Sequence, residues 1–206
     1  MYDTVGSNPE KGSGQDISRV FKEKMFKKAI ALTFIILFIQ GCAYWVRYDG
    51  PYKGRVVDEN TGKPIEGVVV LGVWHTIIKT PAGKTSDFYD ATETITDEKG
   101  EFEIKGKGLR ILSNLDLINV LIFKTGYKYW DVPWVALKED IILRDRIKWE
   151  NDRAIIPLRK LTMAERKAQL SPALPSGAHK NDIKMILNEI NKDRAERGLG
   201  AINVGR

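Results

Sequence analysis

The chain has 206 residues, of which 43% are hydrophobic and 29% are charged. This length suits one compact domain with appendages, and the composition excludes both wholesale disorder and a polytopic membrane protein. The formal net charge of +6 is spread along the sequence without a basic block, which argues against nucleic-acid binding.

The amino-terminal part of the chain contains a polar leader followed by a signal-like segment. Residues 1–24 lack apolar periodicity, so we expect them to be disordered. A short positive region then begins at Met25, residues 29–39 are apolar, and small residues precede the cysteine at position 42. Because the signal begins at Met25, the alternative is that translation starts there and that residues 1–24 are misassigned.

Residues 39–42, Ile-Gln-Gly-Cys, resemble the lipobox of a bacterial lipoprotein signal peptide, which here spans residues 25–42. The resemblance implies cleavage between Gly41 and Cys42, followed by lipid attachment to the cysteine. Cys42 is the only cysteine in the sequence, so no internal disulfide is expected. Ala43, where some lipoproteins have aspartate, implies an outer-membrane location facing the periplasm. The alternatives are an uncleaved transmembrane anchor at residues 29–46 and plain secretion.

A short aromatic segment at residues 43–50 connects the signal to the rest of the chain. It contains Tyr44, Trp45 and Tyr48. Tyrosine and tryptophan are favoured at membrane interfaces, but they are equally typical of a strand. This tether therefore predicts either a first strand or a contact with the membrane surface.

The next part of the sequence has a repeated strand-turn-strand pattern. Residues 52–71 contain two β-branched runs separated by a cluster of turn-forming residues. Residues 91–104 repeat the pattern around a second turn, with apolar residues at every second position after it. A third apolar run follows at residues 120–124. These periodicities predict a mostly β domain.

Two glycine-containing turns, at residues 61–67 and 96–104, and the Lys-Thr-Gly-Tyr of residues 124–127 resemble the carboxypeptidase regulatory-like domain. The resemblance covers about residues 51–129. It implies a transthyretin-like (prealbumin-like) seven-stranded β-sandwich, assigned to residues 51–160, which serves as a structural or binding appendage. The alternative for the acidic turns, calcium binding, is disfavoured because neither turn has the ligand spacing of an EF-hand. We expect no metal and no cofactor.

Several residues of this domain are candidates for contacts with a ligand or partner. We expect an irregular insertion at residues 72–89, which contains Trp74 and His75, and an irregular loop at residues 107–116. The tryptophans at positions 130, 134 and 149 are interpreted as a plug for the open end of the sandwich, with a sugar-stacking platform as the alternative. Residues 154–158 are expected to form the closing strand, kept at an edge by Pro157.

The carboxy-terminal tail, residues 161–206, is predicted to be helical. A capping box at residues 162–165 opens a first helix, and Asn181 or Asp182 is the expected cap of a second one that ends at Gly198. This second helix carries an apolar stripe, which we expect to pack onto the sandwich, with docking onto a partner protein as the principal alternative. The stripe consists of Ile183, Ile186, Leu187 and Ile190.

The sequence offers no support for catalysis. Neither His75 nor His179 is followed three residues later by glutamate, as in metallocarboxypeptidases, and no Gly-x-Ser-x-Gly or P-loop motif is present. We therefore expect a membrane-anchored envelope lipoprotein whose sandwich is a non-catalytic structural or protein-interaction module with an envelope protein partner. The alternative is a carbohydrate-binding module that recognises polysaccharide through exposed tryptophans.

Overall fold

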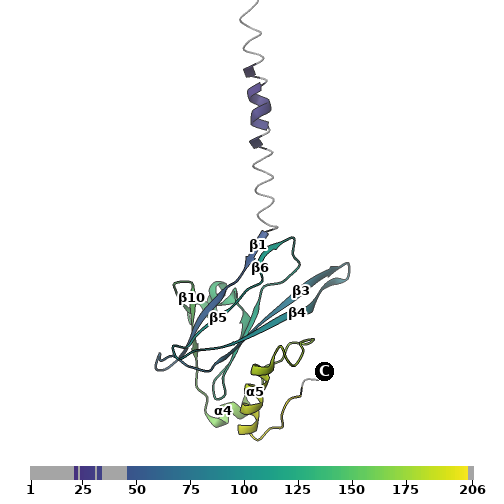
Figure 1. Cartoon of the computed structure of the whole chain (residues 1–206). Coiled ribbons are helices and arrows are strands. Elements are labelled where there is room, and N and C mark those ends of the chain that lie inside the picture. Colours follow the sequence, from purple (N-terminus) through teal and green to yellow (C-terminus); the bar gives the residue numbers. More distant parts are fainter. Residues whose placement is uncertain (1–20, 23, 31, 34–45, 204–206) are drawn as a thin grey trace, which may run out of the picture. The chain divides into compact units, whose positions relative to one another are not determined.

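The structure is a computed structural model that describes residues 21–22, 24–30, 32–33 and 46–203 (Figure 1). The chain divides into two compact units, residues 1–47 and 48–206. Among the described residues of the chain, no helix is long and apolar enough to cross a membrane. Gly41, Cys42 and most of the alternative anchor at residues 29–46 lie outside the described residues.

The first sheet has four strands in the order β5-β2-β10-β9. The strands are β2 (Tyr52–Asp58), β5 (Glu101–Ile104), β9 (Lys148–Glu150) and β10 (Arg153–Leu158). Strand β10 is parallel to β2 and antiparallel to β9, so it is internal, and the expected edge position was wrong. Pro157 is tolerated because β9 pairs only with residues 153–155, so no neighbouring strand requires an N–H at position 157.

The second sheet is antiparallel, with the order β4-β3-β7-β8. Its strands are β3 (Val69–Thr80), β4 (Gly83–Ile95), β7 (Asn119–Phe123) and β8 (Trp130–Pro133). The expected irregular insertion at residues 72–89 is instead a long hairpin with one bulge, between Trp74 and His75. Threonine and isoleucine residues continue the ladder toward Pro81, so this proline marks the turn and does not break the strand.

The two sheets enclose a common hydrophobic core, which confirms the prediction of a mostly β domain. Alternate residues of β2 and β10 point into this core, and β3 and β7 contribute from the opposite side. The described residues form ten strands, more than the seven expected, because the tether at residues 43–50, the loop at residues 107–116 and the segment before residue 154 contain β1, β6 and β9. Fully buried core residues include Val56, Val70, Ile104, Val120, Ile122 and Ile156.

A two-stranded ribbon of β1 (Val46–Asp49) and β6 (Gly108–Ile111) lies at one end of the sandwich (Figure 1). The last ribbon residue of β1, Asp49, is 2% exposed. Its carboxylate accepts hydrogen bonds from Tyr52 Oη at 2.6 Å, Trp74 Nε1 at 3.0 Å and the Lys107 amide at 2.7 Å. Residues 46–49 of the expected tether therefore form a first strand, one of the two predicted alternatives, and its end is anchored in the fold.

Two glycines allow the backbone to pass closely next to this ribbon. Gly50 follows β1 and has a positive φ of 80°, a conformation that favours glycine. A Cβ atom on Gly106 would collide with the carbonyl oxygen of Asp49. The close approach of these two backbone segments therefore depends on the absence of side chains.

The carboxy-terminal helix α5 (Lys184–Glu196) covers the outer face of the second sheet (Figure 1). Ile183, Ile186, Leu187 and Ile190 are each no more than 3% exposed. The three isoleucines belong to a second hydrophobic cluster, together with residues of β3 and β7. The structure thus has the helix packed onto the sandwich, and these four side chains lie in its core instead of on a surface open to a partner.

The two tail helices begin in different ways. Helix α4 (Met163–Ala168) has the predicted capping box, in which Thr162 and Glu165 exchange hydrogen bonds. The expected cap of α5 at position 181 or 182 was wrong, because Ile183 is the N-cap residue and has no capping side chain. Instead, Glu93 of β4 accepts hydrogen bonds from the amides of residues 185 and 186, and burial raises the pKa of Glu93.

Buried charges join α4 to α5. Arg166 donates to Asp193 at 2.6 Å and to Glu196 at 2.9 Å. Arg197 lies 3.1 Å from the other carboxylate oxygen of Asp193 and donates to the carbonyl oxygens of residues 166 and 169. Arg166, Asp193 and Arg197 are all at most 8% exposed. This arginine-carboxylate cluster holds the two tail helices together, because unpaired buried charges would be costly.

Candidate functional site

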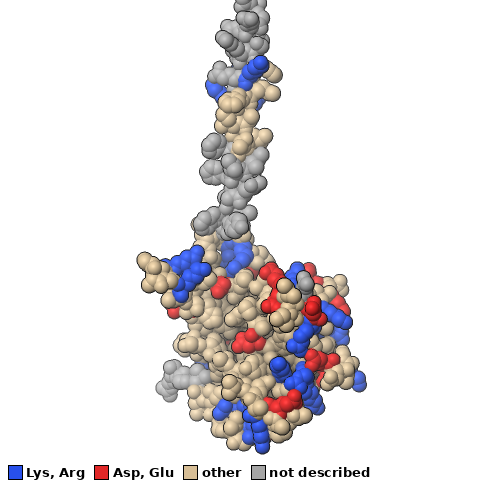
Figure 2. All heavy atoms as spheres, turned by 180° about the vertical axis from the view of Figure 1, so that it is seen from behind, with Lys and Arg blue, Asp and Glu red and all other residues tan. Residues whose placement is uncertain are grey.

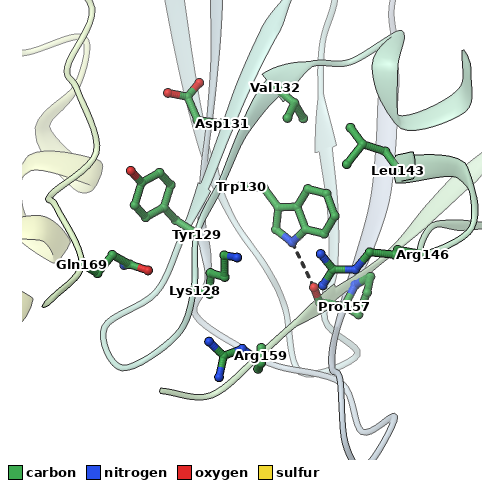
Figure 3. A pocket seen from close by; sticks show the side chains of 10 residues that line it. All are labelled: Lys128, Tyr129, Trp130, Asp131, Val132, Leu143, Arg146, Pro157, Arg159 and Gln169. Carbon is green, nitrogen blue, oxygen red and sulfur yellow. Dashed lines mark hydrogen bonds between the residues drawn. The ribbon is translucent and has the colours of Figure 1, made fainter. Parts of the chain in front are cut away.

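An open pocket of about 520 Å³ lies between β8 and the end of β10 (Figure 3). It also receives residues from helix α3 (Ile141–Arg144), from the segment after that helix and from the end of α4. Helix α2 (Ala136–Glu139) precedes α3 in the connection from β8. The pocket is lined by Lys128, Tyr129, Trp130, Asp131, Val132, Leu143, Arg146, Pro157, Arg159 and Gln169.

Trp130 forms the inner wall of this pocket. Its side chain is 8% exposed, and its Nε1 donates to the carbonyl oxygen of Pro157 at 3.0 Å, a bond that joins β8 to β10 (Figure 3). The guanidinium of Arg146 lies 4.9 Å from the centroid of the indole ring. Because burial and Arg146 cover much of the ring, Trp130 shapes the pocket but offers little free surface for stacking.

Basic side chains outnumber acidic ones around the pocket. Arg146 is paired with Glu59 at 2.7 Å, and Arg159 is paired with Glu165 at 2.7 Å. Lys128 is exposed and makes no ion pair within the part of the chain that the structure describes. Because Glu59 and Glu165 neutralise the two arginines, the unpaired positive charge of the lining comes from Lys128, and it favours an anionic group beside this residue.

The pKa values of two carboxylates near the pocket are shifted in opposite directions. The hydrogen bond from Arg159, with those from Thr162, lowers the pKa of Glu165 to about 2, so this carboxylate stays charged. Burial raises the pKa of Asp131, the one acid in the pocket lining. A nearby anion would raise the pKa of Asp131 further, and protonation would turn this residue into a hydrogen-bond donor.

A second depression of about 450 Å³ adjoins the first and shares Arg146 and Pro157 with it. Its charged lining is mixed, because three basic residues face three acidic ones. One of the acids, Asp58, already accepts hydrogen bonds from the amides of Asn60 and Thr61, which lower its pKa. The first pocket is therefore the better candidate for anion recognition.

The other predicted tryptophans lie in an aromatic cluster that fills the end of the sandwich. Trp74 is fully buried, and Trp134 packs edge to face against Tyr52, Phe102 and Trp149 at 5.5 to 6.2 Å between ring centroids. Two tryptophans of the predicted plug, Trp134 and Trp149, thus pack against the core, whereas Trp130 is buried and lines the pocket. Trp74 has no surface on which a sugar ring could stack.

The two histidines do not form a common site. His75 is half-buried on β3 and lines a small depression of about 180 Å³ together with Asp131 and Leu174. His179 is exposed in the segment before α5. No group of three or more His, Cys, Asp or Glu side chains among the described residues could hold a metal ion.

Sequence reasoning identified Trp130 but missed the cations that accompany it. Lys128 lies two residues before Trp130 in the sequence. This closeness to a candidate tryptophan was the only sequence signal for a cation in the pocket. Arg146 and Arg159 come from distant positions and reach the pocket only through the folding of the first sheet against β8. No sequence spacing connects them.

The chain matches no family model, and it has no match among curated proteins or among solved structures.

Proposed function

We propose that the protein is a lipid-anchored lipoprotein of the cell envelope, held at the outer membrane and facing the periplasm, with a non-catalytic interaction module. The anchor is supported by the lipobox-like sequence that ends at Cys42, the only cysteine in the chain. Tyr48, where the compact unit begins, is six positions after Cys42, a stretch of chain that spans at most about 20 Å when fully extended. An acylated Cys42 would therefore keep the domain at the membrane surface.

The interaction module is proposed to be a carboxypeptidase regulatory-like, transthyretin-like sandwich. Two facing sheets with a common core support this assignment. The observation that carries the recognition role is the positive pocket beside Trp130, in which Lys128 is exposed and free of ion pairs within the described residues. A carboxylate-bearing segment of a partner protein has the charge and size for this pocket, whose volume is within the usual range of ligand sites.

A charge reversal in the pocket tests the recognition role. The lipidated Lys128→Glu protein would be captured from lightly cross-linked envelopes beside the wild type and a Lys180→Glu control, which reverses an exposed lysine outside the pocket. We expect a near-stoichiometric protein partner with the wild type and the control, and its loss with Lys128→Glu. Equal capture by all three proteins would overturn the assignment of the pocket.

The anchor has its own test. Mass spectrometry of the mature protein should find acyl chains on Cys42 as the first residue, and Cys42→Ser should release the protein from membranes. Because this readout does not involve the pocket, the anchor and the recognition site can fail separately.

An acidic carbohydrate is the second candidate ligand. The observation that favours it is the combination of three cations with the half-buried ring of Tyr129 in a pocket large enough for one or two sugar rings. Tryptophan fluorescence separates the candidates, because Trp130 lines the pocket. Quenching by acidic envelope polysaccharide that disappears in Lys128→Glu would favour the carbohydrate, and an unchanged spectrum would favour the protein partner.

A further inference from the structure

The β1–β6 ribbon and the residue after it carry four exposed large apolar side chains. Tyr48, Leu109, Ile111 and Leu112, here called the ribbon face, are between 61% and 71% exposed. Alternation places Leu109 and Ile111 on one side of β6 and Tyr48 opposite Asp49 in β1, and Leu112 directly follows β6. Asp49 points into the core and Arg110 lies against Tyr89 at 5.8 Å, so their neighbours in β1 and β6 point away from the domain.

The backbone conformation and the exposure of Leu112 do not contribute to the stability of the fold. Its φ is 52°, in the left-handed region that glycine and asparagine occupy more easily than leucine. A leucine at this position contributes no burial to the core, because it is 71% exposed. An exposed aliphatic side chain in a disfavoured backbone conformation indicates a role outside the domain.

Basic side chains lie near the ribbon face. The tip of the β3–β4 hairpin is at the same end of the sandwich as the ribbon, and it carries Lys79 and Lys84 opposite each other (Figure 1). Figure 2 shows basic side chains on the lobe that projects at its upper left, which is this hairpin tip. The segment after Leu112 is joined to β3 by the Ile77 amide, which donates to Asn114 at 2.8 Å. Between residues 76 and 86 the hairpin contains no acidic residue, and the first one after Lys84 is Asp87.

The connection to the anchor identifies the surface that this face would meet. Tyr48 of the ribbon is six positions after Cys42 in the sequence, a stretch of chain that reaches at most about 20 Å. Tyrosine is favoured at the membrane interface, leucine and isoleucine partition into it, and lysine pairs with anionic headgroups. We infer that the ribbon face rests on the bilayer that holds the Cys42 lipid, with Lys79 and Lys84 against anionic lipid phosphates. This inference rests on the proposed lipid anchor.

A labelled cysteine at Leu112 tests the contact. The full-length, acylated Leu112→Cys protein would be reconstituted into vesicles of phosphatidylethanolamine and phosphatidylglycerol and labelled with an environment-sensitive fluorophore. Acylated Cys42 does not react, so the label goes to the new thiol. The matched control is Leu170→Cys, at a residue that is 83% exposed beyond α4. We expect a blue-shifted emission at position 112 and at least a threefold weaker quenching by iodide than at position 170.

Each other outcome overturns a defined part of the inference. Equal quenching at both positions in acylated protein would refute the membrane contact while leaving the anchor intact. Protection at position 112 that vanishes when the protein-to-lipid ratio is lowered would assign the ribbon face to a second copy of the chain. A mass spectrum without acyl chains on Cys42 would refute the anchor itself, and this inference with it.

Discussion

Truncation of Ile186 to alanine measures how firmly α5 is held on the second sheet. Ile186 is fully buried in the cluster with β3 and β7. Ile186→Ala removes three buried carbon groups, a transfer cost of about 2.4 kcal/mol at about 0.8 kcal/mol each. The cavity left between helix and sheet raises the expected loss in the free energy of unfolding to about 3–4 kcal/mol.

The assay is urea unfolding of the full chain, followed by far-UV circular dichroism and tryptophan fluorescence. The matched control is Met185→Ala, because Met185 is the neighbouring residue of the same helix and is 43% exposed. We expect the control to lose less than about 1 kcal/mol. Amide hydrogen exchange in α5 adds a local readout, and it should accelerate on the order of 10²-fold in Ile186→Ala.

Equal stability of Ile186→Ala and Met185→Ala, with equal exchange of the α5 amides, would refute the reasoning. The apolar stripe would then not be packed against the sheet in solution. In that case the stripe would again be available to a partner protein, and the buried positions of Ile183, Leu187 and Ile190 would need the same test.

Three further predictions concern charge, close packing and pH. Asp193→Asn should lower the free energy of unfolding by about 3–5 kcal/mol in urea titrations, because two buried arginines lose their common partner; a loss no larger than that of Glu196→Gln would contradict it. Gly106→Ala should lower the melting temperature by about 5 °C or more because its Cβ meets a backbone carbonyl, whereas Gly200→Ala, with open space around it, should not. Because the pKa of Glu165 is about 2, its stabilising contribution is complete above pH 4.5 and is lost as pH falls toward 2. The gap in urea midpoint between wild type and Glu165→Gln should therefore narrow over this range, and a constant gap would contradict it.

Local sequence signals were sufficient for much of the β domain. The β-branched runs around the turn at residues 58–67 correspond to β2 and β3, and the alternation after Gly100 corresponds to β5. Asp97 accepts hydrogen bonds from the amides of residues 99 and 101, as expected for a turn-forming aspartate. These elements could be predicted because the interactions that define them lie within a few residues.

The features that were missed depend on contacts between distant residues. Glu93 caps α5 although it lies 92 residues before Met185 in the chain, so no capping pattern exists at the helix itself. The ribbon strand β6 has only four residues and is defined by its pairing with β1. The candidate pocket likewise combines Lys128, Arg146 and Arg159 from three separate elements.

The parallel pairing of β2 with β10 has a consequence for the order in which the domain can form. Its register joins Lys53 to Arg153, so β2, which can pair with β5 earlier, gains its second neighbouring strand only late in synthesis. A chain emerging from its amino terminus can form the β3–β4 hairpin early, but the core between the sheets closes only after Leu158 is available. Such long-range closure slows folding.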